Sequence, residues 1–508
     1  MPVIRSTRTM PAFWLGLMLA GCAIGPDPLT YPQLQEISDH NTARVTADQE
    51  PMAGAISLYE AMARALKYNL DFKVEIMQKS LRSTELNLAH YNFLPAAVVN
   101  SGYAGRDSYN STGELDIITG KERAARTTSQ ERRNNVADIN FSWNILDFGL
   151  SYIRAHQSAD KVLMAEEAKR KVIQRIIEDT RTAYWRAVSS DRMVHKLASL
   201  EQRTKAALAN TRTLTKSNEV SPITTLTYER ELIEIARAAQ RLQRELSVAK
   251  TQLAALMNLD PGTDFSLDGA ALNAKAPVLE INAQDMTAAA LLNRPELRDI
   301  VYQRRINERE ACAALLELLP GIQLYGGDNY DSNKYLDNNQ WVTWGAKATW
   351  NVMKVFQYPT KQGVIEAQDN LLDARALALT MAVMTQVHVS RIRYVNASRE
   401  LKTARDYFDV QSRLVGQMRK EAAAERISEQ TLIREELNTL VAEAQRDIAY
   451  SGAQNSFANI FASIGLDPYS NELDTGKSVS ELAAQLKGLW LERGDFGGQK
   501  KINLALRQ

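Results

Sequence analysis

Apolar and polar residues alternate strictly along two short stretches of the chain. In residues 137–145 every odd position is apolar, and residues 342–352 repeat the alternation in the matching register. A period of two places one kind of side chain on each face of a β-strand. A second, weaker strand candidate precedes each stretch, in residues 97–103 and 322–325. Each pair of stretches therefore predicts a β-hairpin.

The two predicted hairpins have features of membrane strands. Of the 36 aromatic residues of the chain, 13 lie in residues 95–148 and 320–358. Strands of about ten alternating residues with aromatic ends are typical of a transmembrane β-barrel, whereas a half-buried sheet on a soluble core is the alternative. Four strands do not close a barrel, since the smallest have about eight. In lipid the strand edges must be paired, so we expect oligomers: two copies would supply about eight strands and three about twelve.

Long helices are predicted for most of the remaining chain. Residues 150–216 contain neither Pro nor Gly, which permits a helix of about 100 Å at about 1.5 Å per residue. Residues 223–257 return with apolar residues spaced alternately three and four apart, which is a heptad seam. Together with a helix predicted over residues 69–93, the return segment nearly matches the long helix in length. We therefore expect one long helix to pack against two stacked shorter ones, and residues 360–465 repeat this plan.

The two halves of the chain are repeats of each other. Trp143 and Trp350, each followed by Asn, lie 207 residues apart, and Pro95 and Pro320, each preceded by Leu, lie 225 apart. The halves are colinear except between Pro and Trp, where the first half carries 18 additional residues. An insertion confined to one place indicates a surface loop.

Composition narrows the class of protein. The 508 residues include 61 basic and 60 acidic side chains, 45% are apolar and 24% are charged. This balance argues against a nucleic-acid binder and against a polytopic helical membrane protein. Only 24 Gly and 14 Pro interrupt the chain, which favours long helices over many small domains.

The N-terminus predicts export and lipidation. Arg5 and Arg8 precede an apolar run, residues 12–20, that is too short to span a bilayer, which needs about 17 residues. The run ends in Leu19-Ala20-Gly21-Cys22, which resembles a bacterial lipobox. We predict a covalent lipid on Cys22, with a plain signal peptide as the alternative. In lipoproteins of this type, Ala23 rather than Asp after the Cys implies release to the outer membrane.

No enzymatic constellation is evident in the sequence. The five His residues never occur at zinc-binding spacing, and neither a nucleophile elbow nor a phosphate loop is present. Cys312 is the only other cysteine, so no disulfide framework is expected. We predict that Cys312 is a small buried core residue on a helix.

Two colinear repeats of helix, Leu-Pro, hairpin, Trp-Asn, very long helix and return helix resemble the TolC family of outer membrane efflux proteins. The lipobox and the following residues 24–27 are similar to the OprM-like lipoprotein branch. The resemblance implies a mainly α fold with a small β part, in which a homotrimer forms a 12-stranded β-barrel on a 12-helix α-barrel. It implies an outer membrane location, a tunnel across the periplasm, and two protein partners, a periplasmic adaptor and an inner-membrane transporter.

The same reading predicts the domain organisation. We expect a lipoprotein signal peptide over residues 1–22 and an extended N-terminal segment over 23–56. Repeat 1 covers residues 57–259 with its hairpin at about 95–148, and repeat 2 covers 286–466 with its hairpin at about 320–358. An equatorial linker, 260–285, and a C-terminal equatorial segment, 467–508, complete the chain.

The turns between the long helices are candidate sites. In the TolC family the adaptor docks there, which singles out Val220 and Ser221 in the first repeat and Ile427 and Ser428 in the second. The serines are also plausible N-caps of the return helices, and capping alone is the plainer interpretation.

A pore constriction is the second candidate site. Members of the family place Asp residues just inside the return helix, where this chain has Thr227 and Arg434. The nearest carboxylates shared by both repeats are Glu229 and Glu436, 207 residues apart. If they faced the lumen, a trimer would hold a ring of carboxylates that binds cations. The alternative is that these glutamates lie on ordinary solvated helix faces or form salt bridges, such as one between Glu436 and Arg434.

Three functions follow from these patterns. The first is a passive export channel that needs no cofactor beyond the lipid on Cys22, binds outer membrane lipid and carries an undetermined cargo. The second is a lipid-anchored coiled-coil scaffold or adhesin without a pore. The third, an envelope enzyme, has no supporting residues.

Overall fold

A computed structural model describes residues 27–47, 49–52, 54–122, 125–217, 221–269, 279, 282–466 and 474–495. The chain divides into two compact units, Met1–Glu50 and Pro51–Gln508. The predicted lipidation site Cys22 and the tip residue Val220 lie outside the described residues, so both remain predictions.

The first unit contains the helix α2 (Tyr31–Val45), where the sequence analysis expected extended chain. That expectation was wrong for these residues, because Thr30 and Gln33 form a helix start that we did not identify. The backbone N–H and the hydroxyl of Thr30 both donate to Oε1 of Gln33, at 2.8 and 2.9 Å. Pro32 in the first turn is compatible with a helix, because the N–H groups there have no intrahelical acceptor.

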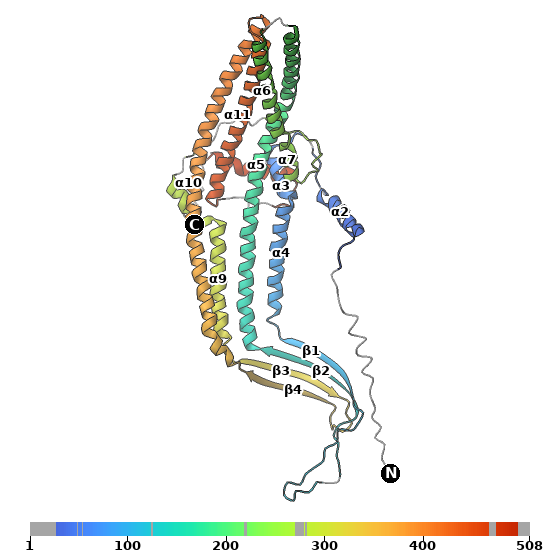
Figure 1. Ribbon diagram of the computed structural model, residues 1–508. Coiled ribbons are helices and arrows are strands. Elements are labelled where there is room, and N and C mark those ends of the chain that lie inside the picture. Colours follow the sequence, from blue (N-terminus) through green and yellow to red (C-terminus); the bar gives the residue numbers. More distant parts are fainter. Residues whose placement is uncertain are drawn as a thin grey trace. The chain divides into compact units, whose positions relative to one another are not determined.

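The second unit is a set of long helices with one small sheet (Figure 1). Each repeat consists of two short helices, a β-hairpin, one very long helix and a return. The predicted fold class, mainly α with a small β part, is confirmed. Within the described residues, no helix combines the length and the apolarity needed to cross a bilayer. The helices are α3 (Leu58–Tyr68), α4 (Leu70–Tyr91), α5 (Ile145–Ser217), α6 (Pro222–Ser247), α7 (Ala249–Leu256), α8 (Ala283–Asn293), α9 (Pro295–Leu316), α10 (Met353–Ala423), α11 (Glu429–Ser463) and α12 (Val479–Asp495).

Breaks and starts of the helices follow local chemistry that recurs in both repeats. Asn69 and Arg294, which are 225 residues apart, adopt the same extended backbone and separate α3 from α4 and α8 from α9. Asn144 accepts a hydrogen bond from the N–H of Leu146 at 3.0 Å, and Asn351 accepts one from Met353 at 3.2 Å. The Trp-Asn dipeptides therefore mark the points where a strand turns into a long helix, because the amide oxygen satisfies an unpaired N–H there.

The 73-residue helix α5 packs against two successive shorter helices, as predicted. Its first half lies along α4, where Lys79 Nζ is 2.7 Å from Glu166 Oε2. Its second half lies along α6 and α11, and their seam buries Leu232 and Ile433 completely. Burial of each such side chain contributes about 1.5–3 kcal/mol.

A core cluster beneath the helix α12 joins the two repeats. Trp185 on α5 contacts Tyr184 and Tyr450 edge-on, with ring centroids 5.2 and 5.0 Å apart. The Tyr184 hydroxyl donates to the carbonyl oxygens of Ile56 and Asp268 at 3.0 and 2.6 Å. Burial raises the pKa of Tyr184, so this group stays a donor that holds two loops.

The strands form one antiparallel sheet in the order β1-β2-β3-β4. Strands β1 (Ala96–Gly105) and β2 (Arg133–Asn144) come from repeat 1, and β3 (Gly321–Asp331) and β4 (Gln340–Thr349) come from repeat 2. Pairing of β2 with β3 unites the two predicted hairpins into a single surface.

Cys312 corrects one prediction. The side chain lies on α9 and is exposed rather than buried. Its neighbours Ala313 and Ala314 are 4% and 2% exposed, so the buried face of α9 passes through them and not through Cys312. An apolar run does not show which of its members face the core, because each residue advances the helix by about 100°.

Candidate functional site

The sheet presents two chemically different faces, both accessible in the single chain. Directly paired residues of an antiparallel sheet share a face, and the register aligns Phe141 with Ala97 and Gly326. This face is mainly apolar, and its Trp344 is 85% exposed. Its polar members are Ser101, Arg133, Asn135, Asp328 and Gln340. Its large apolar members are Val99, Ile139, Phe141, Trp143, Ile322, Leu324, Val342 and Trp344.

The opposite face is mainly polar and closely packed. Asn100 donates to Asp138 at 2.9 Å, and Asn329 donates to Thr343 at 2.9 Å. Gly327 lies beneath Asn140, and a Cβ there would also approach the carbonyl oxygen of Ile139 at 2.6 Å. Two aromatic residues, Tyr325 and Trp341, interrupt the polar surface. An apolar face opposite a polar face is the arrangement of a strand pair between lipid and an aqueous lumen.

The helix turns lie at the end of the unit opposite the sheet (Figure 1). Ser428 is the N-cap of α11, and its hydroxyl accepts from the N–H of Thr431 at 3.3 Å. Ser221 occupies the N-cap position of α6 before Pro222, but its side chain makes no capping bond. The capping prediction is thus confirmed for Ser428. Ser221 lies at the predicted N-cap position but does not form the capping hydrogen bond. Ile427 is half-buried beside Ser428.

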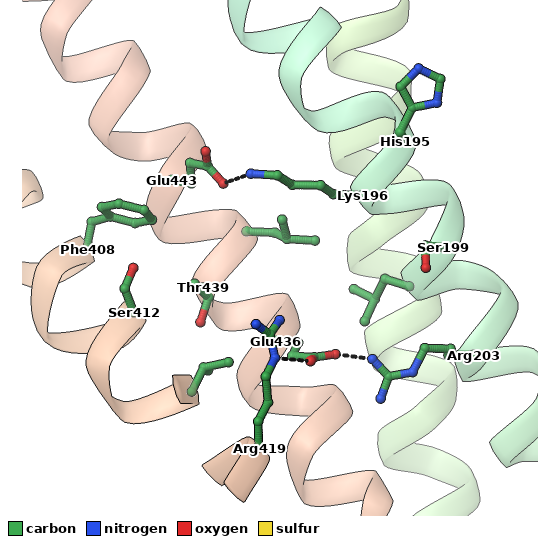
Figure 2. A pocket seen from close by; sticks show the side chains of 13 residues that line it. His195, Lys196, Ser199, Arg203, Phe408, Ser412, Arg419, Glu436, Thr439 and Glu443 are labelled. Atoms are coloured by element: carbon green, nitrogen blue, oxygen red, sulfur yellow. Dashed lines mark hydrogen bonds and ion pairs between the residues drawn. The ribbon is translucent and has the colours of Figure 1, made fainter. Parts of the chain in front are cut away.

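The predicted constriction residues are both held in ion pairs. Glu229 on α6 accepts from Arg212 on α5 at 2.6 Å. Glu436 on α11 accepts from Arg203 on α5 and from Arg419 on α10, the latter at 2.9 Å. Figure 2 shows the two arginines reaching Glu436 from opposite sides.

The salt bridge between Glu436 and Arg434 that we considered from the sequence is not formed. It lies 3.7 Å from Glu231 on α6 and 3.4 Å from Glu435. Because α11 turns its residue 436 toward α5 and α10, the arginine two positions earlier points to a different neighbour.

A cavity of about 610 Å³ lies over α11 between α5 and α10 (Figure 2). Phe408 and Ser412 of α10 line one wall, and Lys196 and Arg203 of α5 line the other. Glu436 and Glu443 lie along α11 in this cavity. Basic side chains of α5 thus face carboxylates of α11 in this cavity, and their ion pairs connect repeat 1 with repeat 2.

The carboxylates Glu443 and Asp447 extend this set of ion pairs along α11. Glu443 accepts from Arg192 and Lys196 at 2.7 Å each, and Asp447 accepts from Arg192 at 3.1 Å and Arg446 at 2.7 Å. Burial raises the pKa of Asp447, although Arg446 and Arg192 oppose this shift.

Our reading of the sequence did not identify Glu443, Asp447 or their partners as candidate residues. The available signal was their spacing, because residues 436, 443 and 447 are seven and four apart and therefore share one helical face. Arg446 is adjacent to Asp447 in sequence. Arg192, which pairs with both carboxylates, lies 251 and 255 positions away, and nothing local identifies it.

No family model and no curated protein matches the sequence. Solved structures do resemble it. The outer-membrane channel OprN is 14% identical with a TM-score of 0.61, covering 87% of this chain and 99% of that one. The MtrE outer membrane channel of Neisseria gonorrhoeae, in an open state, is 13% identical with a TM-score of 0.61, covering 82% and 94%. The CmeC outer membrane channel of Campylobacter jejuni is 13% identical with a TM-score of 0.58, covering 87% and 94%. The chain therefore has the fold of these outer-membrane channels, which is the fold that the resemblance to the TolC family implied.

Proposed function

We propose that this chain is the outer membrane channel of a tripartite efflux or secretion system. It would act as a passive conduit across the periplasm, opened by an adaptor and an inner-membrane pump. The observation that carries the proposal is the sheet: one exposed apolar face, one polar face, and two outer strands, β1 and β4, each paired on one side within the described residues.

An isolated four-stranded sheet of this kind is unstable in a bilayer, because the free N–H and C=O groups of its edges lack partners there. Pairing β1 of one copy with β4 of the next removes both edges. Three copies would give about twelve strands, within the range of bacterial barrels. The resemblance to the TolC family implies three copies rather than two.

The helices supply the second part of the conduit. At about 1.5 Å per residue, α5 is about 110 Å long, which is of the order needed to reach across a periplasmic compartment. The turns at Ser221 and at Ile427–Ser428 would meet the adaptor. The inner-membrane pump would supply the energy and select the cargo.

Glu229 and Glu436 remain the candidates for a constriction in this trimer. In the single chain their arginine partners neutralise them. A cation-binding ring would therefore require these ion pairs to open when the helix ends separate.

The test is the assembly itself. We would purify the protein from outer membranes in mild detergent and image single particles by negative-stain electron microscopy. We expect rods longer than about 100 Å with threefold end views and a disc at one end. Compact monomers, or thin rods without a disc, would contradict the proposal and leave a lipid-anchored scaffold or adhesin as the better explanation.

A further inference from the structure

The loop between β1 and β2, residues 106–132, contains the additional length of the first repeat and forms a defined arm. It leaves the sheet between Gly105 of β1 and Arg133 of β2, at the strand ends farthest from the long helices. Two isolated antiparallel bridges, Thr112 to Thr127 and Leu115 to Glu122, keep its two sides together. A guanidinium–ring contact between Arg132 and Tyr109, 4.8 Å from the ring centroid, braces its lower part.

The base of the arm is clamped to the loop of the second hairpin. Asn333 is 5% exposed; its amide donates to the carbonyl oxygen of Ser129 at 2.8 Å and accepts from the N–H of Glu131 at 3.3 Å. Lys334 and Glu131 add an ion pair at 3.0 Å. The arm therefore leaves the sheet in a set direction.

The tip of the arm presents two isoleucines to solvent on a tight turn. Ile117 is 94% exposed and Ile118 is 97% exposed. The Asp116 carboxylate accepts from the N–H groups of Ile118 and Thr119 at 2.9 and 3.1 Å, and Gly120 closes the turn with a φ of +61°. Two aliphatic side chains exposed on a preorganised turn favour burial against another apolar surface.

We propose that the tips at Ile117 and Ile118 of three copies pack against one another on the symmetry axis and cover the outer mouth of the channel. This inference rests on the proposed trimer. The insertion is present in only one of the two repeats, so a trimer carries three arms rather than six. Each threefold-related tip then meets two identical apolar tips.

Reach and charge both permit this contact. Twelve strands spaced about 4.8 Å apart and tilted about 40° enclose a barrel of about 12 Å radius. One side of the arm, residues 106–117, spans about 36 Å when extended, so the tip can reach the axis. Residues 106–132 contain five acidic and five basic side chains, so the three arms do not repel one another through net charge.

Disulfide trapping tests the contact directly. In a Cys312→Ser background we would introduce Ile118→Cys and oxidise intact cells with copper phenanthroline. We expect disulfide-linked dimers within the trimer, since two of three thiols at the axis can pair. The control Ser108→Cys lies near the base of the arm, where copies would be about 20 Å apart, too far for a disulfide, whose Cα atoms lie within about 7 Å.

Conductance tests the consequence. We expect Ile117→Asp with Ile118→Asp to raise the single-channel conductance of the reconstituted protein about twofold or more, because an apolar closure is lost. Ser108→Asp with Ser111→Asp adds the same charge to the arm and should leave conductance unchanged. Trimers that neither crosslink at position 118 nor change conductance would overturn the contact between tips. If the wild-type protein forms no trimer in electron micrographs, the proposed function fails instead.

Discussion

Buried carboxylates on α11 connect the two repeats through ion pairs with α5. Glu436 is 9% exposed and Asp447 is 1% exposed, yet each contacts two basic side chains. A buried charge is tolerated only when such partners replace water. Removing one partner therefore has a larger effect here than at a surface pair.

We expect Glu436→Gln to lower the free energy of unfolding by about 1–3 kcal/mol. The loss should stay below that of a fully buried pair, because the Arg203 and Arg419 side chains are 37% and 64% exposed. Guanidinium unfolding of the purified protein measures the change. The matched control is Glu229→Gln, whose partner Arg212 is 57% exposed, and it should cost less than about 1 kcal/mol. Equal losses in both variants would contradict the different roles of the two glutamates.

The raised pKa of Asp447 predicts the direction in which the stability of the fold changes with pH. Its pKa is raised in the folded chain above the ordinary value of 3.8, so the folded state favours the protonated form. The contribution of Asp447 to the free energy of unfolding is fully present below pH 3.8. It is lost as the pH rises through the pKa that Asp447 has in the folded state. We therefore expect Asp447→Asn to gain stability relative to the wild type between about pH 3 and pH 7.

Asp264 is the control with the opposite sign. The Lys250 ammonium holds the pKa of Asp264 below its ordinary value, so that stability appears above pH 3.8. Asp264→Asn should therefore lose stability relative to the wild type over the same range, and only slightly because the side chain is 97% exposed. Thermal unfolding of both variants across this pH range measures the two slopes, and parallel slopes would contradict the sign at Asp447.

At the scale of elements, the seam helices and the strands differ in how strongly they depend on neighbours. The helices α6 and α11 bury one continuous stripe against α5, so their position follows from a local period. The sheet depends on close approach at particular glycines, because its polar face is crowded around Asn140.

Gly327 therefore gives an element-scale prediction. A Cβ at this position would meet the Asn140 side chain and the backbone oxygen of Ile139, which cannot move away without distorting β2. We expect Gly327→Ala to destabilise the sheet by about 1–3 kcal/mol and to reduce the amount of protein recovered in outer membranes. Gly326→Ala is the control on the opposite face, where the nearest atom is 3.7 Å away. Equal membrane recovery of the two variants would show that the β2–β3 register is not as described.

At the scale of the whole molecule, the predicted lipid anchor and the sheet belong to separate compact units. The lipobox precedes Glu50, whereas the strands and the long helices all follow Pro51. In the proposed channel, the sheet would offer its own apolar surface to the membrane and would not require the anchor to form it.

Replacement of Cys22 should separate the contribution of the lipid anchor from that of the sheet. We expect Cys22→Ala to abolish incorporation of radiolabelled palmitate while trimers still form, because the strand edges remain the same. Metabolic labelling followed by native gel electrophoresis checks both results. Label retained in the variant would place the lipid elsewhere, and loss of trimers would mean that the anchor is needed for assembly.

The sequence by itself determined the two hairpins, the very long helices, the duplication and the helix start at Ser428, because these arise from periods and caps within a few residues. We did not predict the helix at Tyr31–Val45, although its start, Thr30 with Gln33, matches the capping-box pattern. Only the tertiary structure decided that β2 pairs with β3, that Glu436 meets Arg203 and Arg419, and that Cys312 is exposed. These outcomes depend on which helix faces and strands meet, between residues as many as 233 positions apart in sequence. Packing of the whole molecule makes that choice, and local pattern does not.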